Sequence, residues 1–210
     1  MEKRRQYEAV VHCKIRVIVS SMPDLHSARQ RVAEFRLQPL GFYYLHDNQA
    51  GGASHRMHIW LPGGPDPTEN DQHQHKFDMW SQVLWGALRS DVFRFLEEQS
   101  GGEIEFEVTY ADGHSILMNT GRVGKLESIC TFETGTGKNY FLKAGIIHRA
   151  VAVERPCVTM LTAQDRDIRV FAYGNDETEP PSERRRVNAR EAAQIADLLD
   201  SIIAQSPQAS

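Results

Sequence analysis

The chain has 210 residues, of which 40% are hydrophobic and 25% charged, with a formal net charge of −4. This length is enough for one domain with a buried core. The acidic balance argues against a nucleic-acid partner, which would select a basic surface, and no apolar run reaches the roughly 20 residues that a membrane helix needs.

The N-terminal part predicts a mixed α/β extension. Residues 7–20 are rich in β-branched side chains and partly alternate, which is typical of a strand. Residues 23–42 predict a helix, which Pro23 can start and whose apolar face recurs at steps of three and four residues. That face consists of Leu25, Ala28, Val32 and Phe35. Short strands at 41–47 and 54–62 follow, joined by a turn at 48–52, and a polar loop at 62–71 leads to His73.

From His73 to Gly174 the pattern is mostly β. Short runs rich in strand-forming residues are broken by Gly, Asp, Asn or Pro at spacings of eight to twelve residues, which predicts an antiparallel sandwich or barrel. The expected strands are 75–86, 87–96, 103–111, 126–134, 139–145, 148–153, 157–163 and 168–174.

The C-terminal part changes character. Residues 1–174 are expected to form one domain with its N-terminal extension, residues 175–187 a charged linker, and residues 205–210 a disordered tail. Residues 188–204 predict a helix, because Asn188 and Glu191 have the spacing of a capping box and an apolar stripe follows. The stripe consists of Ile195, Leu198, Leu199, Ile202 and Ile203.

Two histidines two residues apart, His73 and His75, suggest a metal site. On a strand, residues i and i+2 point to the same face, and neutral imidazole suits Zn, Fe, Cu, Ni and Mn. A third ligand is expected from His148, which follows a glycine turn at the start of an alternating strand. The alternative is a solvated pair on a loop.

These stretches resemble the cupin superfamily. His73-Gln74-His75 matches the paired histidines of its first motif, and Val83-Leu84-Trp85-Gly86 matches the end of that motif. Gly145 and His148 match the Gly-x-x-His of the second motif. The resemblance covers residues 55–173 and implies a cupin-like antiparallel β-barrel, or jelly roll, with the N-terminal helix and strand extension and the C-terminal helix added to it.

The chain departs from the family pattern at the acidic ligand. Met79 stands where the first motif carries a Glu, with Asp78 before it, and Lys143 and Ala152 replace the Pro and Asn of the second motif. A three-histidine site similar to that of the thiol dioxygenase branch is the simplest interpretation. Asp78 is a fourth candidate ligand only if a bulge turns it inward, since simple alternation puts it opposite His75.

Other side chains are candidates for the substrate. Arg56 is the cation best suited to grip a carboxylate, and His58 and Trp80 are candidate neighbours. Tyr110 and Tyr140 are candidate catalytic proton donors. Each also has an ordinary structural interpretation: Arg56 and His58 as the polar face of a strand, Trp80 as core, and the tyrosines as strand residues with surface hydroxyls.

The resemblance implies a metal-dependent enzyme with one divalent transition metal, Fe(II) in first place and Zn(II) or Mn(II) as alternatives. We expect a non-haem iron oxygenase acting on a small polar or anionic molecule. A zinc- or manganese-dependent isomerase, lyase or rearrangement enzyme is the first alternative, and a ligand-binding cupin without turnover is the second.

We also expect no nucleic-acid or membrane partner. A homodimer is one way to cover the C-terminal helix and the sheet edges. A cytoplasmic location is expected, because His12, Lys14 and Arg16 interrupt the apolar stretch after the basic N-terminus and no signal-peptide cleavage pattern follows. The three cysteines, Cys13, Cys130 and Cys157, are widely spaced and odd in number, which indicates reduced thiols.

Overall fold

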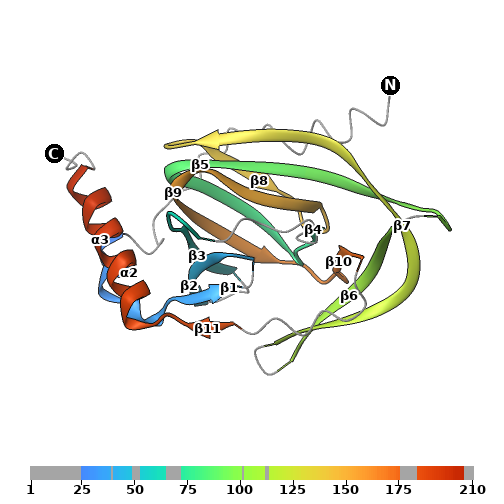
Figure 1. Cartoon of the computed structure of the whole chain (residues 1–210), viewed down its shortest axis with the longest axis horizontal. Helices are drawn as coiled ribbons and strands as arrows, with labels where there is room; N and C mark the ends of the chain where they lie inside the picture. The colour runs from blue at the N-terminus through green and yellow to red at the C-terminus, as the bar shows by residue number, and fades with distance from the viewer. Residues whose placement is uncertain are drawn as a thin grey trace.

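The computed structural model describes residues 25–38, 40–48, 53–64, 72–100, 102–111, 114–175 and 184–205. Within them, strands dominate and the helices gather at one end (Figure 1). The strand expected at 7–20, most of the turn and loop expected at 48–52 and 62–71, and nearly all of the tail expected at 205–210 lie outside the described residues.

The helical elements are α2 (Leu25–Gln30), the 3-10 helix η1 (Val32–Glu34) and α3 (Ala189–Gln205). The strands are β1 (Arg36–Gln38), β2 (Phe42–Asn48), β3 (Ala53–Trp60), β4 (Gln72–His73), β5 (Phe77–Glu97), β6 (Glu103–Ala111), β7 (His114–Gly135), β8 (Asn139–Leu142), β9 (Ile147–Asp165), β10 (Phe171–Gly174) and β11 (Arg185–Arg186). No helix among the described residues combines the length and apolarity needed to cross a membrane.

Six strands pair in a circuit that returns to its start. β9 pairs with β4, β4 with β10, β10 with β6, β6 with β7, β7 with β5, and β5 again with β9, all antiparallel. Strands β3, β2, β1 and β11 extend from β9 in that order, and β8 adds to β5. The closed antiparallel arrangement confirms the cupin-like fold class predicted from the two motifs.

The strands are longer than the sequence predicted. β5, β7 and β9 have 21, 22 and 19 residues, so the short strands expected at 75–86 and 87–96 are one strand. Gly86 lies where β5 bends: its φ is +74°, and the pairing with β9 shifts register around it. A Cβ here would lie 2.4 Å from the Pro156 carbonyl oxygen. The glycine therefore bends the strand without ending it.

The helices cover the outer face of β2, β3 and β9. One apolar cluster joins Phe35 to Met57 and Ile59 of β3 and to Ile195 and Leu199 of α3. Burying a side chain such as Leu199, which is 0% exposed, stabilises the fold by about 1.5–3 kcal/mol. The C-terminal helix thus packs on the sheet of its own chain.

The capping box predicted at the start of α3 is present in the structure, whereas the N-terminal helix is shorter than predicted. The Asn188 Oδ1 accepts a hydrogen bond from the Glu191 amide at 2.9 Å, and the Asn188 amide donates to Glu191 Oε2 at 2.8 Å, which confirms the capping box. The helix expected at 23–42 is shorter, because η1 tightens after α2 and β1 follows. Within the expected linker, β11 pairs with β1.

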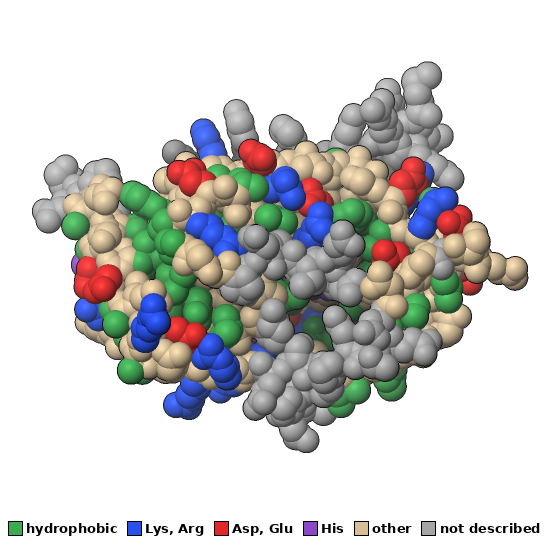
Figure 2. Space-filling view, viewed as in Figure 1, with side chains coloured by type: hydrophobic (Ala, Val, Ile, Leu, Met, Phe, Trp, Pro, Cys, Tyr) green, Lys and Arg blue, Asp and Glu red, His purple; other side chains and the backbone are tan. Residues whose placement is uncertain are grey.

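Side chains of both charge signs are interspersed over the face drawn in Figure 2, among apolar side chains.

Candidate metal centre

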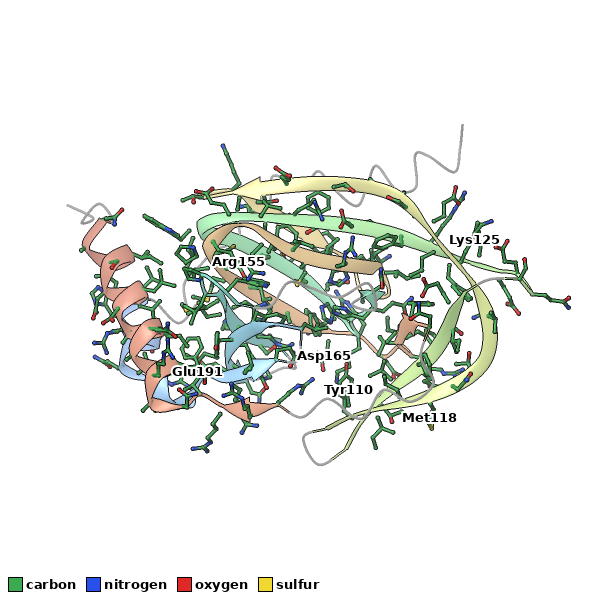
Figure 3. The ribbon with its side chains drawn as sticks, in the orientation of Figure 1. Tyr110, Met118, Lys125, Arg155, Asp165 and Glu191 are labelled. Carbon is green, nitrogen blue, oxygen red and sulfur yellow. The ribbon has the colours of Figure 1, made fainter. Side chains whose placement is uncertain are left out.

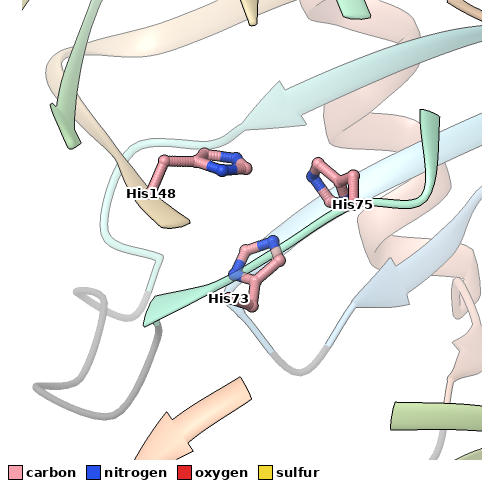
Figure 4. Close-up of side chains that lie close together, drawn as sticks. All are labelled: His73, His75 and His148. Carbon is pink, nitrogen blue, oxygen red and sulfur yellow. The ribbon is translucent and has the colours of Figure 1, made fainter. Parts of the chain in front are cut away.

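Three imidazoles from distant parts of the chain converge at the closure of the strand circuit (Figure 4). The possible ligand nitrogens of His73, His75 and His148 all lie within 4.8 Å of one another. Their ring centroids are 4.7 to 4.9 Å apart. His73 of β4 and His148 of β9 are direct cross-strand partners, and His75 lies between β4 and β5.

The intervening Gln74 fixes the direction of the two neighbouring histidines. Its amide donates to the Phe171 carbonyl at 2.8 Å, and its Oε1 accepts from the Phe171 amide at 3.2 Å. Because Gln74 is held against β10, the alternation of an extended chain turns His73 and His75 to the other side.

Hydrogen bonding selects the tautomer of His148. Its Nδ1 lies 3.2 Å from the Ile146 carbonyl oxygen, which can only accept. Nδ1 therefore carries the proton, and Nε2 keeps a free lone pair for a ligand bond. Burial, with a contribution from His73, lowers the pKa of His148 to about 3.

The surroundings of His75 also favour its neutral form. Burial first, then His73 and His148, hold the pKa of His75 well below its ordinary value. Metal binding requires unprotonated imidazole, so His75 and His148 are ready to bind near neutral pH. Among the described residues, no Asp or Glu belongs to the cluster.

The donor set fits a divalent transition metal. The possible ligand nitrogens lie within 4.8 Å of one another, which is near the separation that bonds of about 2.1 Å from imidazole nitrogen to a shared ion require. Three nitrogen donors suit Zn, Mn or Fe and leave positions open for a substrate, as in catalytic sites.

Asp78 is not brought to the cluster. The pairing of β5 with β9 is regular from Phe77 to Val83, so no bulge turns Asp78 inward. Its Oδ1 accepts from the Ala144 amide at 2.9 Å, and its Oδ2 pairs with Arg166 at 2.6 Å. Its side chain lies on the face of β5 opposite to that of Phe77, as simple alternation predicts.

Met79 takes a core position where an acidic ligand would stand in the family. The side chain is 5% exposed and belongs to an apolar cluster with Leu142 and Ala163. The expectation of an all-histidine donor set therefore agrees with the geometry.

Arg56 lies beside the cluster. Its guanidinium stands 4.4 Å over the Phe77 ring, which stacks on the His75 ring at 4.5 Å and 13°. The buried Arg56 Nε has no hydrogen-bond partner in the described part of the chain. Desolvation is the main reason why the pKa of Arg56 is lowered.

His58 shares the Arg56 face of β3, as the alternation predicted. Its ring is 4.6 Å from that of Phe42 and 6.0 Å from that of Trp60. Burial, and then the charge of Arg56, lower the pKa of His58 to about 3, so it is neutral near pH 7.

The other three candidate residues, Tyr140, Tyr110 and Trp80, lie in different environments. Tyr140 packs against the interior clusters that hold Phe77 and Val83, and burial raises its pKa to about 12. Tyr110 is 51% exposed on the hairpin of β6 and β7 (Figure 3). Trp80 alternates away from the interior and packs on Phe141 at 4.9 Å. The structure thus keeps Tyr140 in the interior and Trp80 on the opposite face of β5, while Tyr110 is near enough to Arg56 that its charge acts to raise the Arg56 pKa against desolvation.

Sequence reasoning missed Phe77, Gln74 and the Ile146 carbonyl. Phe77 had a usable signal, since it continues the two-residue alternation from His73 and His75 onto the same face. The other two contacts depend on β10 and on the turn before β9, which no local pattern specifies.

No protein-family model matches the chain, and no curated protein matches it. Solved structures similar to part of it include oxalate decarboxylases. A single-residue variant of the Bacillus subtilis enzyme matches with 15% identity and a TM-score of 0.40, over 65% of this chain and 28% of that one. The Bacillus subtilis enzyme at pH 4.6 matches with 16% identity and a TM-score of 0.39, over 67% and 30%.

A third similar structure is the formate complex of the Lactobacillus farciminis oxalate decarboxylase, with 16% identity and a TM-score of 0.38, over 76% of this chain and 36% of that one. The matched region is therefore about a third of the length of these proteins. Similarities of this size carry no information on substrate.

Proposed function

We propose that this protein is a divalent-metal enzyme that acts on a small anionic molecule. The observation that carries the proposal is the conjunction of three converging histidines with the buried Nε of Arg56 beside them, which has no hydrogen-bond partner among the residues that the structure describes. His73, His75 and His148 would hold the metal. Such an ion supplies Lewis acidity to a bound oxygen atom.

Arg56 is the anion-binding group in this proposal. Leaving the buried Nε of Arg56 without a partner is costly, and an anionic substrate would offset that cost. Stacking on Phe77 holds the guanidinium plane in place, and a guanidinium held in this way can donate two parallel hydrogen bonds to a carboxylate.

Two neighbouring side chains can hold or accept protons. Tyr140, whose pKa is about 12, remains a phenol at neutral pH and can donate a hydrogen bond. His58, whose pKa is about 3, remains a neutral imidazole and can accept one. One hydrogen-bond donor and one acceptor of this kind suit a proton-transfer reaction. We therefore favour a zinc- or manganese-dependent isomerase or lyase over an iron oxygenase.

Metal analysis of protein purified without added metal tests the proposal. Stoichiometric zinc or manganese, lost in His73→Ala and retained in His55→Ala, is the expected result. His55 is a matched control because it lies on the same strand as Arg56, is 7% exposed, and bonds to Thr162 instead of facing the cluster. Stoichiometric iron with oxygen consumption would move the proposal to the oxygenase.

Absence of metal, with unchanged thermal stability in His73→Ala, would contradict every metal-dependent function and favour a ligand-binding protein without turnover. The anion site has its own test. Arg56→Gln should weaken binding of a small dicarboxylate such as malonate to the metal-loaded protein about 10-fold or more, because a charged hydrogen bond is worth about 1.5–3 kcal/mol, and should leave metal content unchanged.

A homodimer and a cytoplasmic location remain predictions. Light scattering of the purified protein tests the first, and the location of a tagged chain in the cell tests the second.

A further inference from the structure

The turn of residues 143–146 touches two of the three histidines. The Gly145 amide donates to the main-chain carbonyl of His75 at 2.9 Å. The next residue, Ile146, accepts a hydrogen bond at its carbonyl from His148 Nδ1. The position of this turn therefore sets the main chain of one histidine relative to the ring of another.

Asp78 is hydrogen-bonded to the same turn. Its Oδ1 accepts from the Ala144 amide, one residue before the bond to His75. Its Oδ2 accepts from Arg166 Nε and Nη2 at 2.9 and 2.6 Å. Arg166 follows the last residue of β9, and its own amide donates to the Lys76 carbonyl at 2.7 Å.

The Asp78 carboxylate is suited to this task because it is buried and fully engaged. The residue is 7% exposed. Burial alone would raise its pKa, but the bonds from the Ala144 amide and Arg166 outweigh burial and lower the pKa overall. Both oxygens are therefore charged acceptors at neutral pH, and charge-assisted hydrogen bonds are the stronger kind.

We propose that Asp78 is a positioning residue of the metal centre: by anchoring the 143–146 turn it fixes the spacing between His75 and His148 and so raises metal affinity. This inference rests on the proposed function. It also gives a role to the carboxylate beside the position where a ligand was expected. Removal of groups that orient metal ligands typically weakens metal affinity about 10- to 100-fold.

The same strand offers a matched control. Asp91 of β5 is 6% exposed and pairs with Arg149 at 3.0 Å. Its other oxygen accepts from Thr131 at 2.9 Å. It thus resembles Asp78 in burial and in its ion pair, but none of its hydrogen bonds reaches the 143–146 turn.

The experiment compares Asp78→Ala, Asp91→Ala and the unaltered full-length protein. Each is stripped of metal, its thermal unfolding is recorded, and Co²⁺ is titrated while the visible absorption of the bound ion is followed, with Zn²⁺ competition for tight binding. We expect both variants to lose stability, a roughly 10- to 100-fold loss of Co²⁺ affinity with an altered spectrum in Asp78→Ala, and near-normal affinity and spectrum in Asp91→Ala.

Asp78→Asn separates the two bonds of the carboxylate, since its amide oxygen can still accept from Ala144 while its charge is lost; it should bind Co²⁺ more tightly than Asp78→Ala. If Asp78→Ala does not fold, the double variant Asp78→Leu with Arg166→Met replaces the ion pair by apolar side chains, a change that proteins often tolerate. It should show the same weakened Co²⁺ binding.

The outcomes are distinguishable. Unchanged Co²⁺ affinity in the folded Asp78 variants, or an equal loss in Asp91→Ala, overturns the positioning role and leaves the metal centre standing. Failure of the unaltered protein to bind Co²⁺ or Zn²⁺ overturns the proposed function and the positioning role together.

Discussion

Replacing Gly86 by alanine should be among the most damaging small substitutions in the sheet. The φ of +74° is the first reason, since a side chain in the left-handed region costs roughly 1–2 kcal/mol. The second is space: the added Cβ would meet the Pro156 and Glu154 carbonyl oxygens at 2.4 and 2.6 Å. These are backbone atoms, so relief requires moving β9 away from β5, and such overpacking costs about 1–3 kcal/mol.

Together the two contributions predict a loss of roughly 2–5 kcal/mol in the free energy of unfolding, measured by urea denaturation. In a chain of this length the melting temperature should fall by about 4–20 °C. Gly137→Ala is the matched control, because Gly137 has a φ of +77° and nothing within 4 Å of an added Cβ. If the two variants lose the same stability, the close contact with β9 contributes nothing and the reasoning is refuted.

Three further predictions concern other parts of the chain. His148→Ala should abolish the rise in melting temperature that Zn²⁺ or Mn²⁺ gives the unaltered protein, because only the native state would bind the ion; an undiminished rise would contradict the assigned ligand. Leu199→Ala should cost about 2–5 kcal/mol in urea denaturation, as for other fully buried leucines; a loss below 1 kcal/mol would mean that α3 packs loosely. The ion pair with Arg185, opposed in part by desolvation, lowers the pKa of Glu191 from 4.5 to about 2, so its stabilisation is complete above pH 4.5 and is lost as the pH falls toward 2. Glu191→Gln should therefore cost about 1 kcal/mol or less at pH 7 and flatten the acid limb of the stability profile; an unchanged limb would assign the acid sensitivity to other carboxylates.

The sequence specified the kinds of element well and their ends poorly. Asn188 and Glu191 marked the start of α3 because a capping box is a local signal. The bend at Gly86 was misread as a strand end, because a glycine that terminates a strand and one that bends it have the same appearance in a sequence. The difference depends on whether β9 continues opposite it, which is a long-range pairing.

The candidate site was predictable where it depended on alternation. His73, His75 and the outward direction of Asp78 all follow from the two-residue period of extended chain, and the approach of His148 followed from the family resemblance. The roles of Tyr110 and Trp80 remain predictions, because local pattern does not specify which strand face meets which. Arg56 and Tyr140 point inward because of the register of their strands, and that register is determined only when the whole sheet assembles.

The strand circuit is closed by its shortest member. β4 has two residues, and its pairings to β9 and β10 run through Gln72 and His73. His73 is therefore both a candidate metal ligand and part of the strand that closes the circuit. An ion bound by both His73 and His148 would link β4 to β9 where the strand pairing is shortest. Amide hydrogens along β4 and β10 should therefore exchange more slowly in the metal-loaded protein, and local opening of the sheet should begin at these strands when the ion is removed.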